Sequence, residues 1–143
     1  MYKDITLVFD VDGTICPIKR PGDHYSNLPY DKKVVAKIRE YKEGGAKIVL
    51  LTSRNMRTYN GNLGLINAKT AVEMQDWLKR NDIPYDEIYF GKPWPGHRGL
   101  YIDDRAVRPD EFIKHDFDKL EEICKKSSVQ YEDEKDAKKG DKK

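Results

Sequence analysis

The chain has 143 residues, of which 38% are hydrophobic and 36% are charged, and its formal net charge is +2. This length suits one domain with one core. The small net charge gives no reason to expect nucleic acid or an anionic membrane as a partner. No apolar segment approaches the length of a membrane span, and the N-terminus has no signal-peptide pattern, so we expect a cytoplasmic protein.

Charged residues dominate the C-terminal end of the chain. Residues 129–143 hold five acids and five bases and almost no apolar side chain. Such a segment cannot bury enough surface to fold. We therefore expect a folded domain over residues 1–126 and a disordered tail over residues 127–143. Cys16 and Cys124 show no metal-ligand spacing, and we expect both to be free thiols.

Apolar strands and amphipathic helices alternate along the folded part. Asp31 is a suitable N-cap for the first helix, and Gly44 and Gly45 follow its last turn. Strands that alternate with helices predict an α/β fold with a doubly wound parallel sheet. The apolar spacing predicts strands over 5–10, 46–51, 86–90 and 99–102, and helices over 31–43, 68–80 and 116–126.

The most informative run is L-V-F-D-V-D-G-T-I at residues 7–15. Asp10 and Asp12 emerge at the carboxyl end of the first strand, where open α/β sheets bind ligands. Because strand side chains alternate, we expect both carboxylates on one side. Two adjacent acids repel each other unless a cation joins them, which favours a magnesium site. Gly13 allows a sharp turn whose N–H groups can approach an anion. The alternative to a metal site is an ordinary Asp-rich turn at the surface.

Polar residues also follow the other three predicted strands. Thr52, Ser53 and Arg54 come after the second, Lys92 after the third, and Asp103 and Asp104 after the fourth. Any one of these groups alone is weak evidence for a site, since acids often cap helices and a lone lysine is usually solvated. Because the carboxyl ends of parallel strands meet at one edge, the four groups together predict a single site. Arg54, Asn55 and Arg57 could bind a phosphate there, or be ordinary loop residues.

The order D-V-D-G-T (10–14), T-S-R (52–54), Lys92 and I-D-D (102–104) resembles the four motifs of the haloacid dehalogenase superfamily of phosphatases. The resemblance covers roughly residues 1–115. The strings L-L-T-S-R-N-M, G-K-P-W-P-G and Y-I-D-D-R-A-V-R-P are similar to those of small bacterial phosphatases of capsule polysaccharide biosynthesis. The spans between the motifs are too short for a large cap domain, so the chain resembles the capless members.

The resemblance implies a role for each matching residue. Asp10 matches the nucleophile that forms an aspartyl-phosphate, and Asp12 matches the general acid and base. Thr52 would donate its hydroxyl to a phosphoryl oxygen, and Lys92 would neutralise charge on the phosphoryl group and on Asp10. Apart from the resemblance, we expect Gly13, Ser53, Arg54, Asn55 and Arg57 to contact the substrate.

The resemblance also implies a Mg²⁺ ion as cofactor. Its ligands would be the Asp10 carboxylate, the backbone carbonyl of Asp12 and the Asp103 carboxylate. Asp104 would bind through water or orient another ligand. Dehalogenases of the superfamily lack the second aspartate, so the presence of Asp12 favours phosphatase activity over dehalogenation.

Three functions follow as expectations. The first is hydrolysis of a sugar or polyol phosphate in capsule or other polysaccharide biosynthesis. The second is removal of a 3′ phosphate from a polynucleotide end, which an open site would admit although no basic stripe supports it. The third is a non-catalytic module that binds metal or phosphate. An open site also suggests a homo-oligomer in which a neighbouring subunit lends a lid.

Overall fold

The structure is a computed structural model, and it describes residues 1–133. The chain divides into two compact units, Met1–Gly99 and Leu100–Lys143. A single domain over residues 1–126 remains a prediction. Within the described residues, no helix is both long enough and apolar enough to cross a membrane.

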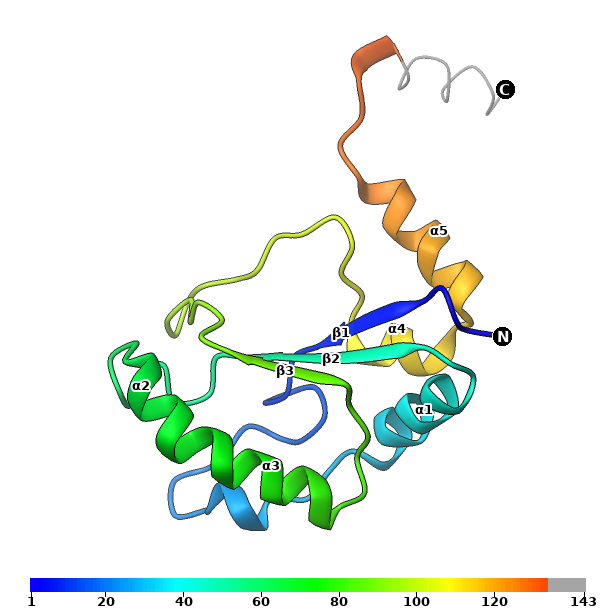
Figure 1. The fold of residues 1–143 in the computed structure, drawn as a ribbon. Helices are drawn as coiled ribbons and strands as arrows, with labels where there is room; N and C mark the ends of the chain where they lie inside the picture. The colour runs from blue at the N-terminus through cyan, green and yellow to red at the C-terminus, as the bar shows by residue number, and fades with distance from the viewer. Residues whose placement is uncertain (134–143) are drawn as a thin grey trace. The chain divides into compact units, whose positions relative to one another are not determined.

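The first unit contains a parallel sheet of three strands in the order β1-β2-β3. All three run from right to left in Figure 1, so their carboxyl ends lie at the same edge. In register, Phe9 is opposite Leu50, and Thr52 is opposite Phe90. Three of the four expected strands are thus confirmed. Their bounds are Thr6–Phe9 for β1, Lys47–Thr52 for β2 and Glu87–Phe90 for β3.

The connection from β1 to β2 contains the short 3₁₀ helix η1 (Tyr25–Asn27) and helix α1 (Lys32–Glu43). The Asp31 side chain accepts a hydrogen bond of 2.9 Å from the Val34 N–H and caps α1, as its sequence position predicts. Gly45 has a φ of 100°, which suits the chain reversal after the helix. The expected helix over residues 31–43 is confirmed.

The connection from β2 to β3 is one helical run that starts earlier than the expected residue 68. Helix α2 (Leu63–Leu65) leads into a π-helical turn, η2 (Ile66–Thr70), and then into helix α3 (Ala71–Arg80). Asn62 caps this run by accepting from the Leu65 N–H. Neither connection holds a further strand or a cap-sized insertion.

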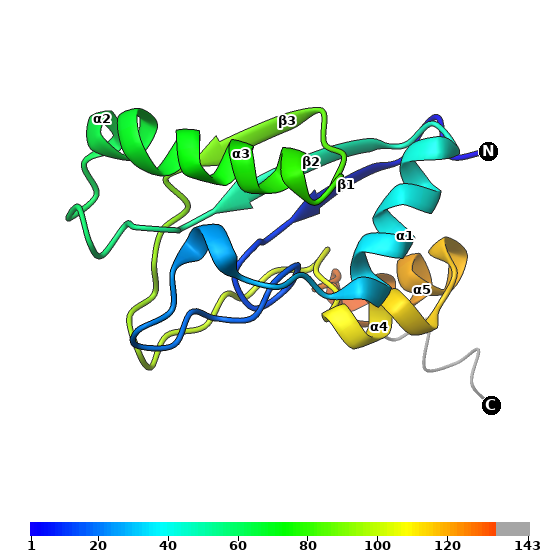
Figure 2. The ribbon, with the colours of Figure 1, turned by 90° about the horizontal axis from the view of Figure 1, so that it is seen from below.

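Helices α1 and α3 both lie below the sheet in Figure 1. The core between them contains the buried side chains of Ile38, Leu50 and Trp77. The Trp77 indole N–H donates to the Leu28 carbonyl over 2.8 Å, which ties the loop before α1 to α3. Figure 2 shows η1 beside α3.

On the opposite face of the sheet, Val8 and Tyr89 are 59% and 53% exposed. Helices of the first unit therefore cover one face of the sheet. The coarser prediction, an α/β fold with a parallel sheet, is confirmed.

The second unit contains helices α4 (Pro109–Lys114) and α5 (Phe117–Ser127). The expected helix over 116–126 is confirmed with Asp116 as its cap, and Leu120 is its buried side chain. Helix α4 was not expected, although Pro109 stands at its first position, where proline is favoured. Residues 134–143 of the predicted tail lie outside the described residues.

The expected strand over residues 99–102 is wrong. No strand forms there, and Leu100 and Ile102 are 84% and 96% exposed. A run of four apolar residues is too short to decide its own structure, because a strand exists only where a neighbour completes its hydrogen-bond ladder.

Candidate active site

A tight turn positions the two aspartates after β1. The N–H groups of Thr14, Ile15 and Cys16 all point to the Val11 carbonyl, at 3.1, 2.8 and 3.3 Å. Gly13 has a φ of 89°, in the region that favours glycine, as the sequence predicts. The Val11 and Ile15 side chains are fully buried, so the core anchors the backbone that carries both acids.

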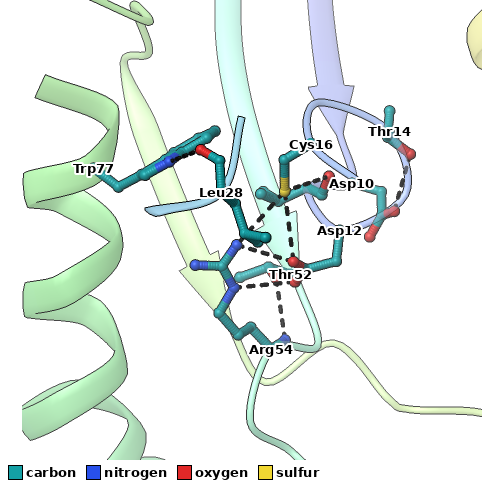
Figure 3. Close-up of polar contacts among 9 residues, drawn as sticks. Asp10, Asp12, Thr14, Cys16, Leu28, Thr52, Arg54 and Trp77 are labelled. Carbon is teal, nitrogen blue, oxygen red and sulfur yellow. Dashed lines mark hydrogen bonds and ion pairs between the residues drawn. The ribbon is translucent and has the colours of Figure 1, made fainter. Parts of the chain in front are cut away.

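Asp10 lies between a hydroxyl and an ammonium group. The Thr14 hydroxyl donates to Asp10 Oδ2 over 3.0 Å (Figure 3), and Lys92 Nζ lies 3.5 Å from Asp10 Oδ1. The Asp10 side chain is 33% exposed, so an incoming molecule can reach it. The structure therefore brings Asp10 and Lys92 together as predicted, and it adds Thr14 to the site.

Backbone pairing explains how Lys92 reaches this place. Lys92 follows the end of β3, and its N–H donates to the Thr52 carbonyl at the end of β2 over 3.1 Å. Thr52 is buried, and its Oγ1 accepts a hydrogen bond of 3.1 Å from the Arg54 N–H. A hydroxyl that accepts one hydrogen bond can still donate its own proton. Thr52 thus retains the donor that its predicted role needs.

Asp12 has a different partner from Asp10. Arg54 Nε donates to Asp12 Oδ2 over 3.1 Å, and Arg54 Nη2 donates to Asp12 Oδ1 over 2.9 Å (Figure 3). The Arg54 side chain is only 2% exposed. Arg54 was predicted to contact the substrate, and the structure turns its guanidinium toward the second aspartate.

This arrangement changes one argument drawn from the sequence. The two acids were expected to repel each other unless a metal joined them. Each carboxylate instead has its own basic partner, Lys92 for Asp10 and Arg54 for Asp12. Repulsion alone therefore does not demand a metal, and the magnesium site remains a prediction.

Cys16 is a neighbour of Asp12 that the sequence did not assign to the site. Its Sγ lies 3.6 Å from Asp12 Oδ1 and 3.8 Å from Arg54 Nη2 (Figure 3). Burial, together with the negative charge of Asp12, raises the pKa of the Cys16 thiol to about 12. The thiol is therefore neutral at physiological pH and acts as a weak hydrogen-bond donor. Both cysteines are free, as expected.

Tyr25 completes the surroundings of Arg54. The Arg54 Cζ lies 4.2 Å from the centre of the Tyr25 ring, a stacking contact between a cation and an aromatic face. Burial, followed by the charge of Asp12, raises the pKa of the Tyr25 hydroxyl. Tyr25 belongs to η1, which Arg80 holds by donating to the Ser26 carbonyl over 2.9 Å. No sequence signal points to this contact.

The remaining predicted substrate contacts lie on the loop after β2. Ser53 accepts from the Met56 N–H through its backbone carbonyl, and Asn55 has a φ of 62°. Arg57 is exposed, with its Cζ 5.7 Å from the centre of the Trp94 ring. Their roles as substrate contacts remain predictions.

Asp103 and Asp104 belong to the second unit and are both exposed. The Arg105 N–H donates to Asp103 Oδ1 over 2.9 Å, and this hydrogen bond holds the pKa of Asp103 below its ordinary value. Within residues 1–133, no three His, Cys, Asp or Glu side chains form a group that could hold a metal ion. The assignment of Asp103 and Asp104 as metal ligands remains a prediction.

Comparison with known proteins finds a similar solved structure. No protein-family profile matches the chain, and no curated protein sequence matches it. The structure is similar to the crystal structure of a structural-genomics target protein from Vibrio cholerae, with a TM-score of 0.81 and 43% sequence identity. The match covers 87% of this chain and 99% of that one. At this identity and coverage, the chain belongs to the same protein family as the Vibrio cholerae protein.

Proposed function

We propose that this chain is a phosphomonoester hydrolase that works through an aspartyl-phosphate on Asp10, as members of the haloacid dehalogenase superfamily do. The observation that supports it most is the pairing of Asp10 with Lys92 at the carboxyl edge of the sheet, 82 positions apart in sequence. A carboxylate beside a lysine and a threonine hydroxyl suits phosphoryl transfer, in which positioning and charge neutralisation provide most of the catalysis.

In the first half-reaction, a carboxylate oxygen of Asp10 attacks the phosphorus atom. A bond forms between this oxygen and phosphorus, and the bond from phosphorus to the substrate oxygen breaks. Asp12 gives its proton to the departing oxygen, so an alcohol leaves. Lys92, 3.5 Å from Asp10 Oδ1, offsets negative charge on the nucleophile and on the phosphoryl group.

In the second half-reaction, water attacks the phosphorus atom of the aspartyl-phosphate. Asp12 accepts a proton from this water, and the bond between phosphorus and Asp10 breaks. The products are inorganic phosphate and the original Asp10 carboxylate, while Asp12 again carries a proton. The sum consumes one water and releases one alcohol and one phosphate.

The proposal includes a Mg²⁺ ion. Its hard oxygen preference suits the partly exposed Asp10 carboxylate, and magnesium commonly needs only one or two protein carboxylates beside water and substrate oxygens. Asp10, the Asp12 carbonyl and Asp103 would hold the ion, and Asp104 would support it. When bound, the ion would neutralise charge on the transferred phosphoryl group.

The substrate class and the cellular location belong to the same proposal. The resemblance to capsule-biosynthesis phosphatases favours a small sugar or polyol phosphate, and the short connections between strands favour an open site. The free cysteines favour a cytoplasmic location. The doubly wound sheet, which needs helices on both faces, also belongs to this proposal; the helices of the first unit cover one of them.

The test is phosphate release from sugar phosphates, polyol phosphates, nucleotides and 3′-phosphorylated oligonucleotides in the presence of magnesium. We expect wild type to release phosphate from a sugar or polyol phosphate, and Asp10→Asn to lose at least about 1,000-fold of kcat. Asp4→Asn, at an exposed acid before β1, serves as the matched control and should behave as wild type.

Each other outcome would count against a defined part of the proposal. Normal turnover by Asp10→Asn would remove Asp10 as the nucleophile. Release from oligonucleotides alone would indicate polynucleotide-end processing. No release by wild type from any compound would favour a non-catalytic binding module.

A further inference from the structure

We propose that Arg54 is a positioning residue for Asp12 and that Tyr25 holds Arg54 in place. This inference rests on the proposed function, in which Asp12 protonates the leaving group. It replaces the expectation that Arg54 contacts the substrate, since its guanidinium is committed to a side chain of the protein itself.

The first support is the geometry of the ion pair. Two nitrogens of one guanidinium donate to the two oxygens of one carboxylate, at 3.1 Å and 2.9 Å. Such a fork fixes both the direction and the rotation of the carboxylate, which a single ammonium cannot do. Arg54 therefore sets where the proton-carrying oxygens of Asp12 lie relative to Asp10.

The second support is the burial of Arg54. Its side chain is 2% exposed, whereas Asp12 is 23% exposed. Within residues 1–133, its Nη1 is buried without a hydrogen-bond partner. A buried cation normally needs full compensation. Among the described residues, the Asp12 carboxylate, the Cys16 sulfur at 3.8 Å and the face of the Tyr25 ring at 4.2 Å compensate this cation.

The contacts also distinguish the two oxygens of Asp12. Oδ1 has two neighbours, Arg54 Nη2 at 2.9 Å and the Cys16 thiol at 3.6 Å. Among residues 1–133, Oδ2 has a single donor, Arg54 Nε at 3.1 Å. The oxygen with fewer donors is the easier one to release. Asp12 therefore keeps Oδ1 on Arg54 while Oδ2 exchanges the proton with the leaving group and, later, with water.

Leaving-group dependence tests this role. A p-nitrophenolate leaves readily without a proton, whereas an alkoxide or phenolate needs one. The effect on kcat of losing acid catalysis should therefore depend on the substrate. We expect Arg54→Gln to lower kcat about 100-fold with the fastest alkyl phosphate, but less than about 5-fold with p-nitrophenyl phosphate. Asp12→Asn should show the same pattern, and the double variant should be no slower than Asp12→Asn alone.

Three further variants serve as controls. Arg54→Lys keeps the charge without the fork and should show the same selective loss, which preserves the test if Arg54→Gln does not fold. Tyr25→Phe keeps the aromatic face and should match wild type, whereas Tyr25→Leu should resemble Arg54→Lys. Arg39→Gln removes an arginine that donates to the carbonyls of Asn81 and Asp82, and should leave the ratio of the two rates unchanged.

Equal losses with both substrates in Arg54→Gln and Arg54→Lys would show a merely structural role and overturn the inference. A wild type that hydrolyses p-nitrophenyl phosphate but no alkyl or phenyl phosphate would also overturn it, because no acid would then be acting. A wild type without any phosphatase activity would instead overturn the proposed function. The two failures are therefore distinguishable.

Discussion

Lys92 Nζ lies 3.5 Å from Asp10 Oδ1, although Asp10 follows β1, Lys92 follows β3 and the two residues are 82 positions apart in sequence. The link between them runs through β2, because the Lys92 N–H donates to the Thr52 carbonyl. The edge of the sheet therefore brings the Asp10 carboxylate and the Lys92 ammonium group together.

Replacing Lys92 with methionine keeps the length of the side chain and removes its charge. We expect kcat for phosphate release to fall about 100- to 1,000-fold, since the charge of the phosphoryl group would lose a preorganised partner. Steady-state kinetics on the best sugar phosphate measure this. Lys47→Met, at an exposed lysine paired with Glu87, is the control and should retain full turnover; equal losses in both variants would contradict the role.

Removal of divalent cations tests the metal part of the proposal. We expect EDTA to abolish phosphate release and added MgCl₂ to restore it. Magnesium should also raise the melting temperature of the apo protein by binding the folded state, and Asp10→Asn should reduce this shift. Differential scanning fluorimetry gives that second readout without any substrate. Full activity after exhaustive EDTA treatment would show that the hydrolase works without a metal.

Cys16 should make stability fall at alkaline pH. Its thiol pKa is about 12 in the folded state, above the ordinary value of 9.0. The unfolded chain therefore loses this proton first, so the stabilisation is complete below pH 9 and is lost as pH rises toward 12. The melting temperature of wild type should fall more steeply between these values than that of Cys16→Ala. Cys124→Ala should follow wild type, and parallel curves for all three would refute the assignment.

Trp77 should contribute to stability through both its volume and its N–H. Trp77→Phe leaves the Leu28 carbonyl without its 2.8 Å donor and opens space in the core. We expect the free energy of unfolding to fall by about 2–3 kcal/mol. Urea unfolding measures this. Trp94→Phe, at a tryptophan that is 40% exposed, should change it by less than about 0.5 kcal/mol.

The parts of the fold that sequence predicts well are those with local signals. Helix α1 has a capping aspartate and four apolar residues at helical spacing, all of which are buried. The run at 99–102 had apolar residues alone, and its structure depends on a partner that local sequence does not name. Helix α3 illustrates an intermediate case: its end at Arg80 agrees with the expected range of 68–80, but the helical run begins at Leu63, before a π-helical turn for which the sequence gives no local signal.

The candidate site shows the same division. Asp10 and Lys92 were expected together because parallel strands share an edge, and this holds. The fork between Arg54 and Asp12 was not expected, since T-S-R gives no direction for a side chain. Tyr25 could not have been found at all, because its contact with Arg54 arises from the path of a long loop.

Among the described residues, hydrogen bonds attach the loop between β1 and α1 to the rest of the first unit at its two ends and not in its middle part. Near its end, the Leu28 and Ser26 carbonyls accept hydrogen bonds from Trp77 and Arg80 of α3. Near its beginning, the Ile15 carbonyl accepts a hydrogen bond from the Asp31 N–H. Residues 17–24 lie between these attachments and carry most of the loop's exposed positions. Ile18 and Lys19 in this stretch lie close to Gly13 and to the Tyr25 ring, so exchanged sequences there would change the surroundings of Asp12 and Arg54. Mutagenesis of residues 17–24 would therefore alter side chains beside the candidate site, whereas residues 26–28 attach the loop to α3 and should be left intact.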